Sequence, residues 1–185
     1  MKKMLKWPLI AAVALFLVAI LIVVIATSGP KERYPKIADL LYAKYYEYAP
    51  GAPLELMFHG YRGSGERDLC GGVQRCFKVG RSALIVDQRC AGKSGGREIT
   101  FGIREHRDCL TWVDFMCRHF GPDVKIILTG ISMGAATVLM AGGHPLPDNV
   151  IGILADCGYT SAREIIHKIL RQIHLPIRLV YPFVK

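Results

Sequence analysis

The residues KIILTGISMGAATVLMA, numbers 125–141, carry the strongest structural signal in the chain. The apolar run from Lys125 to Thr129 is typical of a buried strand, and Ala135 to Ala141 is typical of the start of a helix. Between them stands the pentapeptide Gly130-Ile131-Ser132-Met133-Gly134. A serine on such a sharp strand-to-helix turn is exposed at the end of a sheet, and glycines leave room where strand and helix nearly touch. The pattern predicts Ser132 as a nucleophile, with a plain glycine-rich turn as the alternative.

A second motif lies upstream, where the apolar run from Leu54 to Phe58 predicts another buried strand that leads into a glycine-rich loop. Acyl transfer needs two backbone N–H groups that point at the oxyanion of the tetrahedral intermediate. The residue after the nucleophile, Met133, and Tyr61 in this loop are the candidates for these donors. His59 precedes the serine in sequence, so we expect it to orient the loop through a hydrogen bond. The loop glycines alone would also suit a merely flexible segment.

A third segment follows the predicted strand Ala83 to Asp87, where Asp87, Arg89, Gly92 and Ser94 are spaced as D-x-R-x-x-G-x-S. Together the three segments resemble the α/β-hydrolase superfamily, which has D-x-R-G-x-G-x-S at this place. The chain differs at Cys90, where the family usually has glycine, and we expect this to change the shape of the loop more than the chemistry.

The resemblance extends over roughly residues 40–185, to the bacterial, membrane-anchored serine hydrolases of this superfamily. The segments that carry it are Ile99 to Glu105, Asp108, Trp112 with Val113, Asp156 to Ser161, and Tyr181 to Phe183. It implies a serine hydrolase that cleaves an ester, thioester or amide bond of a small-molecule, lipid or peptide acyl substrate. The reaction would pass through an acyl-enzyme on Ser132, with water as the second substrate and with no cofactor or metal.

Predicted strands and helices alternate along the chain, which favours an α/β fold with a parallel sheet and helices on both faces. We expect helices over residues 68–78, 102–120 and 161–173, the last opened by a capping box from Ser161 to Glu164. Ile103 is expected on the buried face of the second helix. Residues 150–155 predict a further strand. Residues 39–48 alternate as in a strand, although an amphipathic helix also fits them.

The amino-terminal part predicts a membrane anchor. Residues 9–26 are an uninterrupted apolar run that is long enough to cross a bilayer, and Lys2, Lys3 and Lys6 precede it. We therefore divide the chain into a basic segment (1–8), a transmembrane helix (9–26), a linker (27–36) and a partial α/β-hydrolase domain (37–185). Cleavage near Ala26 is the alternative. The flanking lysines and arginines slightly favour a single-pass protein with its domain outside the cytoplasm.

The charge and the cysteine content of the chain limit the kinds of partner that we expect. The formal net charge is +9, but no run of five like charges occurs, so we expect attraction to an anionic membrane surface and no nucleic-acid partner. The six cysteines form no C-x-x-C pair and suggest no zinc site. We expect them to be buried free thiols, with a Cys70–Cys76 disulfide as the alternative.

A catalytic base for Ser132 is harder to find. In the family's chain order an acid and then a histidine follow the serine. The later histidines are His144, His167 and His174, and none stands where the resemblance puts the catalytic one. Asp156 is the one candidate for the acid. We therefore expect an amino-terminal part of a longer protein. The alternatives are a catalytically incomplete binding protein and an acyltransferase on the same scaffold.

Overall fold

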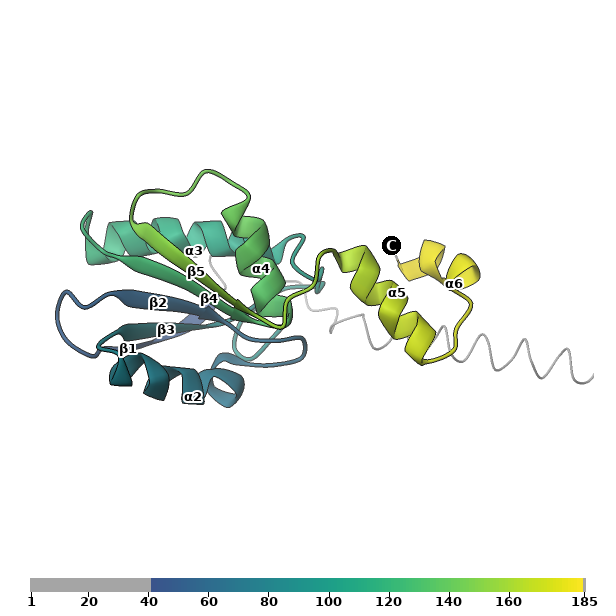
Figure 1. The fold of residues 1–185 in the computed structure, drawn as a ribbon, viewed down its shortest axis with the longest axis horizontal. Coiled ribbons are helices and arrows are strands. Elements are labelled where there is room, and N and C mark those ends of the chain that lie inside the picture. The colour runs from purple at the N-terminus through teal and green to yellow at the C-terminus, as the bar shows by residue number, and fades with distance from the viewer. Residues whose placement is uncertain (1–40, 185) are drawn as a thin grey trace, which may run out of the picture.

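A computed structural model describes residues 41–184 as one five-stranded sheet with helices on both faces. Figure 1 shows α2 below the sheet, α3 and α4 above it, and α5 with α6 beyond one end of the strands. The elements in chain order are β1 (Tyr42–Tyr46), β2 (Leu54–Phe58), α2 (Gly65–Lys78), β3 (Ser82–Asp87), α3 (Glu105–Phe120), β4 (Ile126–Ile131), α4 (Met133–Gly142), β5 (Val150–Asp156), α5 (Ala162–Gln172) and α6 (Ile177–Val184).

The strands follow the order β1-β3-β2-β4-β5, and β1 alone runs antiparallel to its neighbour. The prediction of an α/β fold with a mainly parallel sheet is confirmed. Residues 42–46 form the strand and not the competing helix, since β1 pairs with β3 from Tyr42 opposite Asp87 to Tyr46 opposite Ala83. Parallel order brings the carboxyl ends of β2, β3, β4 and β5 to one edge, where the loops that follow them meet.

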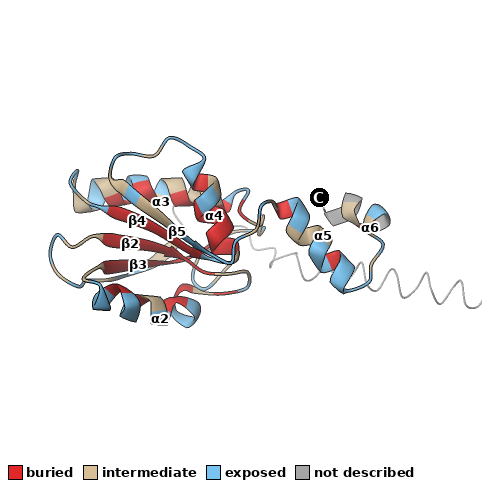
Figure 2. Ribbon diagram, in the orientation of Figure 1, coloured by how far each residue is buried: buried red, intermediate tan, exposed pale blue. Residues whose placement is uncertain are grey.

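The inner strands are buried, whereas β5 is largely exposed. Every residue of β2 and β3 is buried, because helices cover both faces of these strands (Figure 2). One cluster lies under α3 and α4 and includes Leu56, Phe58 and Leu128, and a second lies under α2 around Met57. In contrast β5 is the outermost strand on its side of the described sheet, and Leu154 is 43% exposed. Within the described residues β5 is therefore an open edge that presents apolar side chains.

Two predicted helix starts were wrong. The helix expected over residues 68–78 is α2 and begins at Gly65, and the helix expected over residues 102–120 is α3 and begins at Glu105. The buried Glu105 carboxylate accepts hydrogen bonds from the N–H groups of Thr100 and Gly102, both at 2.8 Å. Phe101 and Gly102 have positive φ angles of 51° and 98°, which a helix does not allow. Ile103 lies outside α3 and is 54% exposed, so its expected burial was also wrong.

The predicted basic segment, membrane helix and linker, residues 1–36, lie outside the described residues. Within residues 41–184 no helix combines the length and apolarity that a bilayer crossing needs. All six cysteines are free, which excludes the Cys70–Cys76 disulfide here. Cys70 and Cys157 are exposed, so the expectation of buried thiols holds fully only for Cys76 and Cys109.

A buried carboxylate ties α2 to the centre of the sheet. Glu55 of β2 is 0% exposed and accepts hydrogen bonds from Arg75, from Arg81 at 2.7 Å and from Thr129 at 2.9 Å. Burial raises the pKa of Glu55, but the bonds from Arg75, Arg81 and Thr129 outweigh it, so the net pKa lies below the ordinary value. Arg75 and Arg81 stand near the two ends of the α2–β3 connection, so this charge cluster fixes how the helix lies on the sheet.

We predict that Glu55→Gln lowers the free energy of unfolding by about 3 kcal/mol at pH 7, because both arginines lose their buried counter-charge. A carboxylate with a lowered pKa stabilises the fold above its ordinary pKa and loses that effect as the pH falls through the folded pKa. The difference between wild type and variant should therefore shrink towards pH 3. Urea denaturation at pH 7 and at decreasing pH measures both effects, and a difference independent of pH would contradict the assignment.

Candidate active site

Ser132 lies on the predicted sharp turn between β4 and α4. Its φ and ψ angles are 54° and −110°, a left-handed conformation that a non-glycine residue rarely adopts. Such strain persists only where the surroundings enforce it. A Cβ atom on Gly130 would lie 2.1 Å from the carbonyl oxygen of Gly134, and one on Gly134 would lie 2.1 Å from that of Phe58. Both glycines are therefore required by backbone packing.

We predict that Gly134→Ala unfolds the protein or lowers its free energy of unfolding by about 3 kcal/mol or more, since the new methyl group meets rigid backbone. The matched control is Gly71→Ala in α2, where a Cβ meets nothing within 4 Å. This control should stabilise the fold by roughly 0.5–1 kcal/mol through helix propensity. Thermal unfolding of both variants checks the pair, and a Gly134→Ala protein as stable as wild type would refute the packing argument.

The loop after β2 lies directly against the serine. A Cβ on Gly60 would be 3.5 Å from Ser132 Cβ and 4.0 Å from Ser132 Oγ. The buried His59 orients this loop, because its Nδ1–H donates to the Gly60 carbonyl at 2.7 Å while its Nε2 accepts from the N–H of Gln88 at 3.0 Å. Burial lowers the pKa of His59, which keeps the imidazole neutral. These contacts fit the predicted orienting role of His59 and occupy both ring nitrogens.

Gln88 extends this network across the sheet. Its side-chain amide donates to the His59 carbonyl at 2.6 Å and accepts from the Thr137 hydroxyl of α4 at 3.1 Å. The loop that carries Tyr61 and the helix that carries Met133 are thus connected through one buried side chain. The sequence did not indicate this role for Gln88, since a polar residue after a strand is also typical of a solvated loop.

The two predicted oxyanion donors occupy suitable elements. Met133 is the first residue of α4, where a backbone N–H has no partner within the helix. Tyr61 follows Gly60, and its ring contacts that of Phe101 with centroids 5.1 Å apart. Because Gly60 approaches Ser132 from the loop and Met133 follows Ser132 in the chain, both backbone segments border the same hydroxyl. Their role as donors stays a prediction.

The D-x-R segment forms a support for this loop. The Asp87 carboxylate accepts from the N–H groups of Gly65 at 2.7 Å and Lys93 at 2.8 Å, so it holds the start of α2 against the loop after β3. Arg89 makes two hydrogen bonds of 2.7 Å to Asp108 of α3. Cys90 has a φ of 61°, the left-handed conformation that glycine adopts most readily. The chain therefore maintains a glycine-like backbone at this position with a cysteine.

Ser132 opens into a cleft of about 630 Å³ between α4, the end of β5 and α5. Its wall includes apolar side chains and two charged ones. The lining residues are Ser132, Leu139, Ala155, Cys157, Gly158, Tyr159, Thr160, Glu164, Ile165 and Lys168. This volume is in the range of small-molecule sites, roughly 300–1,000 Å³.

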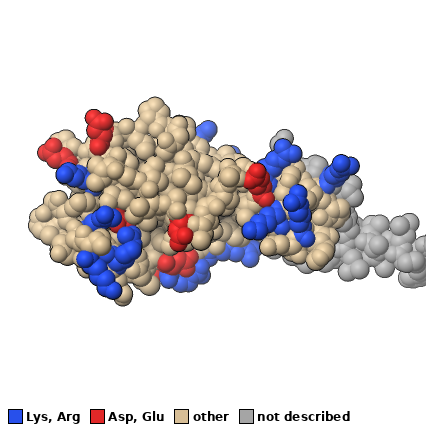
Figure 3. Space-filling model, viewed as in Figure 1, with Lys and Arg blue, Asp and Glu red and all other residues tan. Residues whose placement is uncertain are grey.

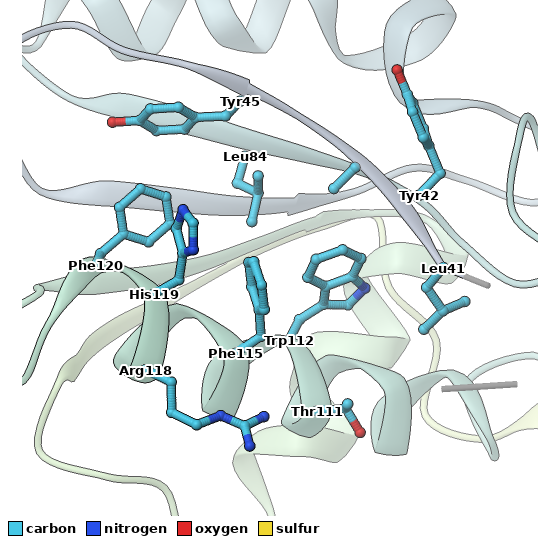
Figure 4. A pocket seen from close by; sticks show the side chains of 11 residues that line it. Leu41, Tyr42, Tyr45, Leu84, Thr111, Trp112, Phe115, Arg118, His119 and Phe120 are labelled. Atoms are coloured by element: carbon cyan, nitrogen blue, oxygen red, sulfur yellow. The ribbon is translucent and has the colours of Figure 1, made fainter. Parts of the chain in front are cut away.

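A second hollow of about 660 Å³ lies between β1 and α3 and shares no lining residue with the Ser132 cleft. Figure 4 shows aromatic side chains of α3, among them Trp112, Phe115 and Phe120, that point toward Tyr45 and Leu84 of the sheet. The one hydroxyl that α3 contributes, Thr111, donates to the Arg107 carbonyl at 3.0 Å. This hollow lies away from Ser132 and its glycine-rich turn.

Comparisons with known proteins bear on the fold. No family model matches the sequence. A Bacillus subtilis (strain 168) protein, YqkD, is 29% identical over 99 residues, which are 53% of this chain and 32% of that protein. The Pyrococcus furiosus esterase Pf2001 superposes with a TM-score of 0.61 and 20% identity over 85% of this chain and 65% of its own. A Paleococcus ferrophilus monoacylglycerol lipase superposes with a TM-score of 0.51 and 20% identity over 70% of this chain and 50% of its own.

The described part of the chain has the α/β-hydrolase fold. The resemblance seen in the sequence is thus confirmed at the level of the fold. The chain spans about a third of the length of YqkD and about two thirds of that of the esterase.

In the α/β-hydrolase fold a histidine removes the serine proton, and the described residues bring none to Ser132. His144 follows the far end of α4, a helix about 15 Å long, and its ring stacks on that of His106. His167 packs edge-on against Tyr181 at 4.6 Å, with its Nε2 buried and unpaired. His174 is exposed at the end of α5. None of the three lines the cleft.

Asp156, the candidate acid, lies at the end of β5 beside the serine. Its backbone carbonyl accepts from the N–H of Ser132 at 2.8 Å. Its carboxylate is exposed and accepts from the Cys157 thiol at 3.1 Å. Within residues 41–184 no histidine contacts this carboxylate, and it does not line the cleft. Its catalytic role therefore stays a prediction without a partner here.

Proposed function

We propose that this chain carries the nucleophile and the oxyanion hole of a membrane-anchored serine hydrolase with ester, thioester or amide substrates. The observation that supports this most is the left-handed backbone of Ser132, enforced by Gly130 and Gly134 and open to a cleft. Ser132 Oγ would attack the substrate carbonyl, and the N–H groups of Tyr61 and Met133 would stabilise the oxyanion. The acyl group would remain on Ser132 until water releases it.

The esterase and lipase folds found by comparison support small-molecule or lipid esters as the substrate class. A binding protein without catalysis is the second candidate, and one observation favours it. No histidine of residues 41–184 lines the Ser132 cleft, so the hydroxyl lacks a base there. An acyltransferase on the same scaffold would share the acyl-enzyme and differ only in the acceptor.

We predict that a fluorophosphonate probe labels the chain and that Ser132→Ala abolishes the labelling while the fold persists. The Ser132 elbow and the two N–H donors are sufficient for slow phosphonylation, because an oxyanion hole retains part of the rate enhancement without the other triad members. Probe fluorescence after denaturing electrophoresis measures the labelling. Circular dichroism controls for folding. Equal labelling of the variant would exclude Ser132 as the nucleophile, and no labelling of wild type would favour the binding protein.

The proposed anchor comprises residues 9–26, with the domain on the outer side of the membrane. We predict that the chain stays in the pellet when membranes are washed with alkaline carbonate, because an apolar helix of this length remains in the bilayer. Immunoblotting of pellet and supernatant measures this, and a variant with Leu15 and Leu21 changed to arginine serves as the control that should be released. Recovery of wild type in the supernatant would rule out the anchor.

A further inference from the structure

Helix α5 forms one wall of the Ser132 cleft. Three residues at helical spacing, Glu164, Ile165 and Lys168, line this wall, and Leu139 of α4 and Ala155 of β5 lie among the remaining lining residues. Residues three and four positions apart share a helix face, so Lys168 lies on the same face as Ile165 and Glu164. Two of these groups are charged, and their partners decide which charge the cleft presents to a substrate.

The carboxylate on this wall is already engaged. Glu164 accepts a hydrogen bond from the Thr160 hydroxyl, and its backbone N–H donates to Ser161 Oγ at 3.1 Å. The bond to Ser161 Oγ is one half of the predicted capping box, and the Thr160 hydroxyl takes the place of the Ser161 N–H in the other half, so the carboxylate stays at the first turn. Lys168 stands one turn further along and forms no salt bridge with any residue from 41 to 184. Glu164 keeps its negative charge, so the wall carries one charge of each sign, and the Lys168 ammonium is the one available to an anion.

The charged side chains around Lys168 are mainly cationic as well. Over residues 161–184 four side chains are cationic, namely Arg163, Lys168, Arg171 and Arg178, and Glu164 is the single acid. Figure 3 shows this excess of Lys and Arg over the α5–α6 end of the molecule. A concentration of one sign beside a cleft raises the local concentration of ligands with the opposite charge. The α5 end thus favours an anion.

The rest of the cleft is suited to an apolar chain. The apolar side chain of Leu139 is 51% exposed to solvent. It lines the cleft together with Ile165 and Ala155. A ligand that covers these side chains would remove apolar surface from water, which is favourable. The cleft therefore combines Ser132, an apolar wall, the Lys168 ammonium and the Glu164 carboxylate that the Thr160 hydroxyl holds.

We propose that Lys168 is a specificity-determining residue that binds an anionic group of the substrate, so that the site selects acyl esters bearing a carboxylate or phosphate. The acyl chain lies against Leu139 and Ile165, and the anion lies at the Lys168 ammonium. This inference rests on the proposed function of Ser132. It assigns no step of the reaction to Lys168, which acts through substrate binding alone.

The test uses the full chain and two fluorophosphonate probes with alkyl tails of equal length, one ending in a methyl group and one in a carboxylate. We expect wild type to bind the carboxylate probe more tightly before the covalent step. Lys168→Met should raise the inhibition constant of that probe about fivefold, the scale of one partly exposed ion pair. The maximal labelling rate and the response to the methyl probe should not change. Lys168→Arg should restore the preference.

The matched control is Arg171→Met, which removes the same charge from α5 at a position that does not line the cleft. An equal loss in this variant would attribute the preference to the general field of α5 and overturn the role of Lys168. Equal binding of both probes by wild type and Lys168→Met would overturn the inference while the nucleophile stands. If neither probe labels wild type, the proposed function fails and this inference fails with it. A third probe with a phosphonate in place of the carboxylate separates the two kinds of anion.

Discussion

The structure depends on one close approach between backbones, where α4 begins against the end of β2. Gly134 allows this contact with the Phe58 carbonyl, and Gly130 allows the contact of the strand with the first turn of the helix. The cost is the left-handed conformation of Ser132. A strained non-glycine residue of this kind stays in place only when the packing on both sides leaves it no alternative. The same packing exposes the serine at the carboxyl edge of the sheet.

The other loops at this edge are held by buried polar side chains. His59, Gln88 and Thr137 connect the loop after β2 to α4, Asp87 connects α2 to the loop after β3, and Arg89 connects that loop to α3. Each of these groups is satisfied by hydrogen bonds, and removal of one partner would leave a buried group unpaired at a cost of roughly 1–3 kcal/mol. The edge is therefore pre-organised, which is what an oxyanion hole needs in order to act at the moment of reaction.

Much of this arrangement could be predicted from the sequence, since the buried strands, the Ser132 turn and the Ser161 cap each depend on short-range patterns. The starts of α2 and α3 could not, because they depend on where the carboxylates of Asp87 and Glu105 find their donors. The exposure of Ile103 has the same origin. Glu55 lies in a strand of apolar residues, and nothing nearby in sequence shows that Arg75 and Arg81 would pair with it. Lys168 becomes informative only when α5 is seen to border the cleft.

The central claim is that Ser132 presents its hydroxyl to the N–H groups of Tyr61 and Met133. A crystal structure of the chain after reaction with a phosphonate ester tests it most directly, because the phosphoryl oxygen imitates the oxyanion. We predict phosphorus bonded to Ser132 Oγ, with that oxygen about 2.7–3.1 Å from both nitrogens. An adduct on another residue, or a phosphoryl oxygen that points away from both N–H groups into solvent, would contradict the account.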